Sequence, residues 1–287
     1  MRNIKLTIEY DGKEFNGWQR QPDRLNIQGT IEQAIKQVTG EDVDLTASGR
    51  TDAGVHAIGQ VANFKTNSNI PIEKIPIAIN TNLKKSIRIV KAEEVDERFH
   101  SRLSCKRKTY RYVINCSNCE SAIYRNLETY IPFKLDVEKM NQAAKFLEGE
   151  HDFKAFRASG TSSKSSVRTI YSAKVIQKEN DRIHIELTGN GFLYNMVRII
   201  AGTLVEVGTG KIAPEDIPNI ILSKKRENAG KTLPAKGLFL LNVKYENSDI
   251  EAKPFHPKDF SDIEAKPFRP EDFSDIGDRP FCPEDFQ

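Results

Sequence analysis

The sequence is poor in the residues that build metal centres and disulfide frameworks. Its 287 residues include 4 cysteines, 5 histidines, 3 methionines and 1 tryptophan. Only Cys116 and Cys119 are close in sequence, and no second close pair accompanies them. A structural zinc site needs four ligands, so we favour ordinary thiols over a metal site built with Cys105, Cys282 and the scattered histidines.

Long apolar runs are also missing. No stretch approaches the roughly 18 consecutive apolar residues of a membrane-spanning helix. Residues 1–5 lack the apolar run of a secretory signal. The low cysteine content agrees with a reducing compartment. We therefore expect a cytoplasmic protein that does not associate with membranes.

Charge is distributed unevenly along the chain. Residues 248–287 hold 5 Lys or Arg and 11 Asp or Glu, a net charge of −6, whereas residues 1–247 hold 38 and 29, a net charge of +9. A basic body favours a polyanionic partner such as nucleic acid, although charge that serves only solubility explains it as well. With 38% hydrophobic residues, the body can fill a sizeable core.

The C-terminal segment, residues 248–287, differs in composition from the rest of the chain and is repetitive. Residues 248–260, 261–273 and 274–286 are three copies of a thirteen-residue unit with two Pro and two Phe each. Frequent proline with excess acid argues against a packed core, so we expect a disordered, flexible tail. We favour a remnant of replication slippage without function. The alternative is that the paired phenylalanines bind an unknown partner multivalently.

Hydrophobic periodicity predicts two halves with the same order of elements. The first half is expected to contain strands at 4–10, 43–47, 60–64 and 87–92 and helices at 27–40 and 71–79. The second half is expected to contain strands at 110–114, 170–178, 182–188 and 237–245 and helices at 136–147, 192–207 and 214–223.

This order predicts an α+β fold of two side-by-side split β-α-β (ferredoxin-like) units that share a central cleft. The N-terminal unit is expected at residues 1–105 and the C-terminal unit at 106–247, followed by the tail at 248–287. Ligands commonly bind in the groove between such units, so we expect the functional site there.

One loop between predicted strands carries the clearest chemical signal. It places one acid beside a base among small residues, in the order Ser48-Gly49-Arg50-Thr51-Asp52-Ala53-Gly54-Val55-His56. The glycines allow the backbone to bend, and Arg50 can keep a partly buried Asp52 ionised. The pattern is typical of a loop that presents a carboxylate for chemistry. From these residues alone, a turn aspartate paired with Arg50 stays an open interpretation.

Further motifs accompany this loop across residues 4–245. They are, in chain order, Tyr10-Asp11-Gly12, Gly17-Trp18-Gln19-Arg20-Gln21, Phe99-His100-Ser101-Arg102, Lys108-Thr109-Tyr110-Arg111-Tyr112, Asn195-Met196-Val197-Arg198 and Gly237-Leu238-Phe239. With the loop, the set resembles the TruA family of tRNA pseudouridine synthases. One such motif is weak, whereas the ordered set is specific. Ser101 stands where the family often has Ala.

The resemblance implies isomerisation of uridine to pseudouridine in the anticodon stem-loop, at tRNA positions 38, 39 and 40. In this reaction the glycosidic bond from ribose C1′ to N1 breaks, the uracil turns, and C1′ is joined to C5. The resemblance further implies that no cofactor and no metal take part, and that a homodimer binds folded tRNA across a basic cleft.

The resemblance also assigns catalytic roles. Asp52 matches the family's nucleophilic aspartate; whether it attacks C1′ or C6, or supports a glycal intermediate, stays open. Tyr110 matches the tyrosine against the target base, which can stack and join proton transfer at C5. Arg198 matches the arginine that pairs with the catalytic carboxylate. Without the resemblance, the sequence would indicate a core position for Tyr110 and an Arg198 side chain that extends to the helix surface.

Substrate binding is assigned in the same way. Arg50 resembles the residue that helps to hold the target nucleotide out of the stem. We expect Leu238 beside the uracil, with a core position as the alternative. Lys106, Arg107 and Lys108 are expected to bind the RNA backbone, although any one of them could simply be solvated.

Two functions of other classes stay open at this point. A non-catalytic tRNA-binding or folding factor would use the same basic cleft without needing Asp52. A nucleoside or glycoside hydrolase would also attack C1′, but its usual design takes two facing carboxylates, and the loop holds one acid.

Overall fold

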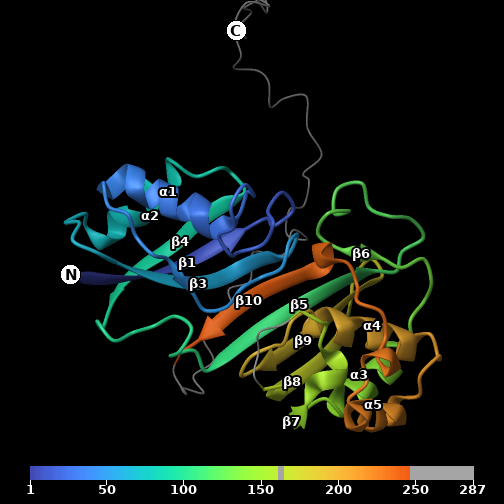
Figure 1. Cartoon of the computed structure of the whole chain (residues 1–287). Helices are drawn as coiled ribbons and strands as arrows, with labels where there is room; N and C mark the ends of the chain where they lie inside the picture. Colours follow the sequence, from blue (N-terminus) through green and yellow to red (C-terminus); the bar gives the residue numbers. More distant parts are fainter. Residues whose placement is uncertain (161–164, 246–287) are drawn as a thin grey trace, which may run out of the picture. The chain divides into compact units, whose positions relative to one another are not determined.

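The computed structural model of the protein describes residues 1–160 and 165–245 (Figure 1). The strands are β1 Arg2–Tyr10, β2 Thr46–Ala47, β3 His56–Thr66, β4 Ile87–Val95, β5 Arg107–Asn115, β6 Thr129–Tyr130, β7 Gly149–Asp152, β8 Val167–Lys178, β9 Arg182–Gly189 and β10 Leu238–Lys244. The helices are α1 Ile27–Thr39, α2 Ile75–Asn80, α3 Val137–Lys145, α4 Met196–Gly208 and α5 Ile217–Ser223. None of these helices has the length and apolar character to cross a bilayer. The three repeats lie outside the described residues.

All described strands belong to one mixed sheet in the order β4-β1-β3-β10-β5-β9-β8-β7, with β2 beside β3 and β6 beside β5. Helices α1 and α2 lie over the part of the sheet formed by β1, β3 and β4, whereas α3, α4 and α5 lie with β7, β8 and β9 (Figure 1). Strand β10 joins the two parts, because it pairs in parallel with β3 and antiparallel with β5. The expected mixed fold of helices and strands is confirmed.

Local sequence signals account for most of these elements. In β1, the alternating residues Ile4, Leu6 and Ile8 are fully buried, as the predicted half-buried strand requires. Helix α1 begins where the Asn26 side chain accepts a hydrogen bond from the Gly29 N–H, and it ends at a left-handed glycine, Gly40 (φ 75°). The β8–β9 hairpin turns through two residues of positive φ at 180 and 181, which suits its Asn-Asp pair.

Several expected elements have other bounds in the structure, and two short strands were not expected. The strand expected at 43–47 is only two residues long, because the Leu45 N–H donates to the Glu32 side chain of α1 instead of a neighbouring strand. Helix α4 begins at Met196 and not at 192, because Asn195 has a left-handed backbone (φ 58°). Strands β6 and β7 were not predicted; β7 is polar and short, so it carries no hydrophobic alternation.

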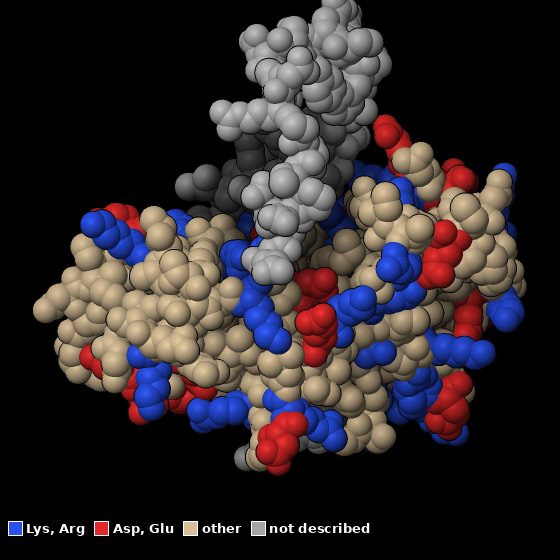
Figure 2. Space-filling view, turned by 90° about the horizontal axis from the view of Figure 1, so that it is seen from above, with Lys and Arg blue, Asp and Glu red and all other residues tan. Residues whose placement is uncertain are grey.

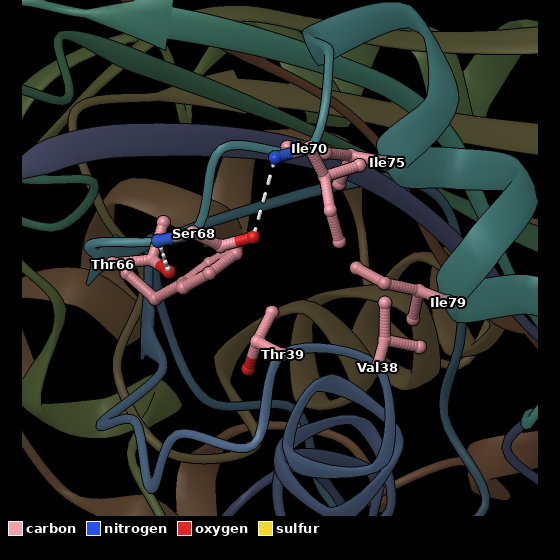
Figure 3. A pocket seen from close by; sticks show the side chains of 8 residues that line it. Val38, Thr39, Thr66, Ser68, Ile70, Ile75 and Ile79 are labelled. Atoms are coloured by element: carbon pink, nitrogen blue, oxygen red, sulfur yellow. Dashed lines mark hydrogen bonds between the residues drawn. The ribbon is translucent and has the colours of Figure 1, made fainter.

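Helices α1 and α2 leave a small gap against β3 (Figure 3). The cavity has a volume of about 10 Å³. Its lining residues are Val38, Thr39, Phe64, Thr66, Ser68, Ile70, Ile75 and Ile79. A volume of this size holds at most about one water molecule, so the gap is a packing feature and not a ligand site.

Helix α4 is packed unusually tightly against the segment that precedes β10. A Cβ atom at Gly202 would lie 1.8 Å from the Lys231 carbonyl oxygen, and one at Gly230 would lie 2.6 Å from the α4 backbone. This close approach brings the Leu233 carbonyl oxygen within 2.7 Å of Arg198 Nε. The glycine contact therefore helps to set the position of Arg198.

Replacing Gly202 with alanine tests this packing. An alanine in a helix interior normally stabilises by about 1 kcal/mol relative to glycine. Here the added methyl group meets backbone atoms, so we expect Gly202→Ala to lower the free energy of unfolding by about 1–3 kcal/mol, measured by urea denaturation. An unchanged or increased stability would show that the two backbones do not approach this closely.

Candidate active site

The loop that carries Asp52 connects β2 to β3, and its backbone is hydrogen-bonded to neighbouring segments. The Ser48 N–H donates to the Val61 carbonyl oxygen of β3 at 2.7 Å. The Trp18 N–H donates to the Thr51 carbonyl oxygen at 3.0 Å. Backbone hydrogen bonds at Ser48 and Thr51 therefore fix the N-terminal half of the loop, up to the residue before Asp52.

Buried polar side chains hold the same loop from beneath. Gln60, fully buried in β3, accepts a hydrogen bond from Ser48 Oγ at 2.7 Å and donates from Nε2 to the Gly49 carbonyl oxygen at 2.9 Å. The Tyr10 hydroxyl shares a 2.7 Å hydrogen bond with Thr51 Oγ1. The role of Gln60 was not predicted; its signal is a long amide side chain at a fully buried position of β3, where it needs hydrogen-bond partners.

The C-terminal end of the loop is fixed by His56. Its Nδ1 accepts a hydrogen bond from the Gly12 N–H at 3.1 Å, and its Nε2 lies 3.1 Å from the Asn126 carbonyl oxygen. Burial lowers the pKa of His56, while the Asp11 carboxylate, whose Oδ1 lies 3.1 Å from Nδ1, acts in the opposite direction. The ring also stacks on Phe239 of β10 at a centroid distance of 4.8 Å.

Asp52 faces Arg198 and not Arg50. Its Oδ2 lies 3.8 Å from Arg198 Nη1, and its side chain is 30% exposed. Burial raises the pKa of Asp52, while the Arg198 charge acts in the opposite direction. Arg50 is exposed, and within the described part of the chain the ion-pair partner of Asp52 is Arg198. The interpretation of Asp52 as a turn residue paired with Arg50 is therefore wrong.

Arg198 is held in the interior by neutral groups as well. Its Nε donates to the Leu233 carbonyl oxygen at 2.7 Å, and its Nη1 donates to Asn195 Oδ1 at 2.8 Å. The side chain is only 17% exposed, so it does not extend to the helix surface. These bonds fix the guanidinium beside Asp52 without neutralising it, which leaves its charge available to the carboxylate.

Tyr110 lies in the middle of β5 and is 8% exposed. Its ring meets Phe192 edge-on, with centroids 5.2 Å apart and an interplanar angle of 82°. Burial raises the pKa of Tyr110, and the Tyr10 and Asp52 side chains raise it further. The hydroxyl therefore stays protonated at neutral pH and can act as a neutral donor or acceptor, not as a phenolate base.

Leu238 is the first residue of β10 and is 5% exposed. It pairs with Tyr112 of β5, and Leu240 pairs with Tyr110. Since residues two apart in a strand point to the same face, Leu238, Leu240 and the two tyrosines share one face of the sheet. Leu238 thus lies near Tyr110, where both a core contact and a contact to a bound base are sterically consistent.

The three neighbouring basic residues have different surroundings. Lys106 is exposed, the Arg107 guanidinium lies 4.7 Å from the centroid of the Tyr171 ring, and Lys108 donates from Nζ to the Ser48 carbonyl oxygen at 2.6 Å. Figure 2 shows Lys and Arg side chains spread over one face of the protein with Asp and Glu between them. Of the three, Lys106 is thus the most available to a polyanion.

The site thus brings together a carboxylate from the β2–β3 loop, a guanidinium from α4 and a phenol from β5. A single partly desolvated carboxylate can add to an electrophilic carbon and leave again. Among residues 1–160 and 165–245, no cluster of three or more His, Cys, Asp or Glu side chains suits a metal ion. The geometry favours nucleophilic chemistry by one acid.

Ionising Asp52 in the folded protein is unfavourable, which gives a stability prediction. The pKa of Asp52 is higher in the folded protein than in the unfolded chain, where it is near 3.8. The protonated carboxyl group therefore contributes its full stability below the unfolded pKa, and this stability is lost as the pH rises through the pKa of the folded state. Asp52→Asn removes this loss, so we expect a higher Tm than wild type at pH 7 and a shrinking difference toward pH 4. Thermal unfolding across this range measures it; a lower Tm of the variant at pH 7 would contradict the raised pKa.

Comparison with known proteins extends over the same residues. A family model described as tRNA pseudouridine synthase matches residues 6–103 and 143–246. The chain is 52% identical over 245 residues to tRNA pseudouridine synthase A of Caldicellulosiruptor bescii, which is 85% of this chain and 100% of that protein. The enzyme of the same name from Acetivibrio thermocellus has the same identity and coverage. A solved chain, "Crystal Structure of a Cbf5-Nop10-Gar1 Complex", gives a TM-score of 0.33 at 13% identity, covering 84% of this chain and 59% of that chain.

The matched segments include Asp52 and Arg198, while Tyr110 lies between them. They end at residue 246, before the first repeat begins at 248. Because the match covers both halves of the sheet and the full length of the two relatives, the chain belongs to the tRNA pseudouridine synthase family.

Proposed function

We propose that the protein isomerises uridine to pseudouridine in the anticodon stem-loop of tRNA, at positions 38, 39 and 40, with Asp52 as the nucleophile. The observation that carries this proposal is the Asp52 carboxylate 3.8 Å from the Arg198 guanidinium, close enough to the buried Tyr110 to raise the pKa of its hydroxyl. The three side chains come from distant parts of the sequence. Membership of the family supplies the substrate class.

The reaction is an isomerisation, so no atom is gained or lost. The C1′–N1 bond breaks and the uracil takes its electron pair. After the ring turns, C5 bonds to C1′, and the C5 proton is lost while N1 gains one. Asp52 can serve by adding to C1′, by adding to C6, or by supporting a glycal intermediate. All three routes need an ionised carboxylate. In the two additions it is a nucleophile that later leaves, and in the glycal route it is the base that takes the C2′ proton and returns it.

The neighbouring groups adjust this carboxylate. Arg198 favours the charged form of Asp52, which burial alone would disfavour. Its hydrogen bonds to Leu233 and Asn195 hold it in place, so little reorganisation is needed during the reaction. Tyr110 offers its ring to the target base and a protonated hydroxyl to the proton transfer at C5.

Substrate binding extends outward from this centre. The target uridine must leave the stem, which costs a few kcal/mol of unstacking. Arg50 is exposed two residues before Asp52, a position that supports a role in holding the displaced nucleotide. Leu238 contacts the uracil, and Lys106 and Arg107 bind phosphates of the stem.

We also infer how the protein is divided into units and how it assembles. Residues 1–105 and 106–247 form two split β-α-β units with the tRNA cleft between them. Two protomers form a homodimer, so that one subunit acts on the anticodon arm while the other holds the body of the tRNA. The protein works in the cytoplasm, without a cofactor, and the repeats at 248–287 are either without function or bind a separate partner.

Incubation with a tRNA transcript that carries tritium at C5 of uridine tests this function. We expect wild-type protein to release tritium and to form pseudouridine at positions 38, 39 and 40. The near-isosteric Asp52→Asn should lower turnover by about 10³-fold or more, since the amide cannot act as a nucleophile. Wild-type turnover in this variant would contradict the proposal, free uracil in the products would indicate a hydrolase, and tRNA binding without any turnover by wild type would indicate a binding factor.

Tyr110→Phe separates stacking from proton transfer. The phenylalanine keeps the ring and loses the hydroxyl, so we expect tRNA affinity within about twofold of wild type and turnover about 10²–10⁴-fold lower. Single-turnover kinetics with filter binding measure both quantities. Unchanged turnover would exclude the hydroxyl from the chemistry.

A further inference from the structure

Lys108 differs from the other basic residues near the site. It lies in β5 two residues before Tyr110, whereas the exposed Lys106 precedes the strand. Residues with this spacing point to the same face of a strand. Lys108 is half-buried, and its Nζ donates to the Ser48 carbonyl oxygen at 2.6 Å, which makes it a contact to the first residue of the catalytic loop.

The surroundings disfavour a free ammonium at this place. Burial lowers the pKa of Lys108, and the positive charges of Arg102 and Arg168 lower it further, whereas the Cys105 thiol acts in the opposite direction. The carbonyl contact offsets part of this cost, because a hydrogen bond to a charged donor is stronger than a neutral one. An ammonium group held by this hydrogen bond is not free to bind a phosphate of the RNA backbone.

Gly49 shows what the same contact requires of the neighbouring backbone. A Cβ atom at Gly49 would lie 2.7 Å from Lys108 Nζ and 3.7 Å from Lys108 Cε. The backbone of Gly49 is not in the left-handed region, so its conformation does not demand glycine. The missing side chain leaves room for the ammonium. Gln60 donates to the carbonyl oxygen of Gly49 itself, so two donors hold two consecutive carbonyl groups.

We propose that Lys108 is a positioning residue for the reaction assigned above: it fixes the N-terminal end of the loop and thereby the Asp52 carboxylate, four residues further on. The proposal rests on the proposed function. It separates Lys108 from Lys106, whose exposed side chain is available to RNA phosphates.

The two roles give opposite kinetic results. A displaced nucleophile loses turnover, since a misplacement of about 1 Å can cost about 10²-fold in rate. A lost phosphate contact instead weakens tRNA affinity and reduces the slope of log affinity against log salt concentration by about 0.7–0.9. Turnover, affinity and salt slope together therefore identify which role a lysine has.

The experiment compares Lys108→Met with Lys106→Met in the full-length protein, using one tRNA transcript and single-turnover kinetics. For Lys108→Met we expect a fall in the maximal rate of about 10–100-fold, with tRNA affinity and salt slope within error of wild type. For Lys106→Met we expect weaker affinity and a smaller salt slope. Weaker affinity and a smaller slope in Lys108→Met, or an unchanged rate, would overturn the proposal.

Gly49→Ala provides a test that keeps every charge. The added methyl group displaces the ammonium from the Ser48 carbonyl oxygen, so we expect a rate loss similar to that of Lys108→Met at unchanged affinity. In the double variant Gly49→Ala/Lys108→Met the collision is absent, so its rate should equal that of Lys108→Met alone. If the rate losses of the two single variants multiplied in the double variant, or if Gly49→Ala had the wild-type rate, the two residues would not share this contact.

Two controls separate the possible failures. Thermal unfolding of each variant shows whether a rate loss follows from an unfolded protein; since Gly49→Ala leaves Lys108 in place, it decides the question if Lys108→Met does not fold. Wild-type protein measured in parallel tests the proposed function itself. Absence of pseudouridine with wild type refutes that function, whereas active wild type with the overturning pattern refutes only the role of Lys108.

Discussion

The site depends on a loop whose backbone is fixed before any substrate arrives. Side chains and backbone groups from β1, β3, β5 and the segment around Trp18 bind residues 48–56, and no single element supplies them all. A partly desolvated carboxylate is unfavourable in the folded protein, and it persists because the surrounding structure holds it beside Arg198. Preorganised charge of this kind needs little reorganisation during reaction, which is its value to an enzyme.

The position of this loop in the sheet explains how distant residues meet. Strand β10 pairs with β3 through Phe239 with His56 and Leu240 with Ala57, at the C-terminal end of the loop. The same strand pairs with β5 beside Tyr110. The loop therefore lies where the two parts of the sheet join, so that Asp52 of the first part faces Arg198 of the second, and its charge influences Tyr110.

The hydrophobic pattern of consecutive residues was enough to predict most helices and strands, but not which strands pair with each other. The alternation in β1 and the caps of α1 are properties of a few consecutive residues, so the sequence defines them. The place of β10 between β3 and β5 depends on pairings far apart in sequence, which periodicity does not encode. For the same reason the adjacent Arg50 was a natural partner for Asp52, while Arg198 was assigned only through the family resemblance. The hydrogen-bond partners of Gln60 and Lys108 could not be predicted from the sequence, because they are backbone carbonyl groups of a loop whose position only the structure gives.

The pH dependence of single-turnover pseudouridine formation tests most directly whether the Asp52–Arg198 pair governs the reaction. Activity should rise with pH as Asp52 ionises, with a midpoint above 3.8, since burial raises its pKa. Because Arg198 lowers that pKa, Arg198→Met should move the midpoint to higher pH at saturating tRNA. A midpoint that stays in place or falls in the variant would contradict the view that this ion pair controls the reacting carboxylate.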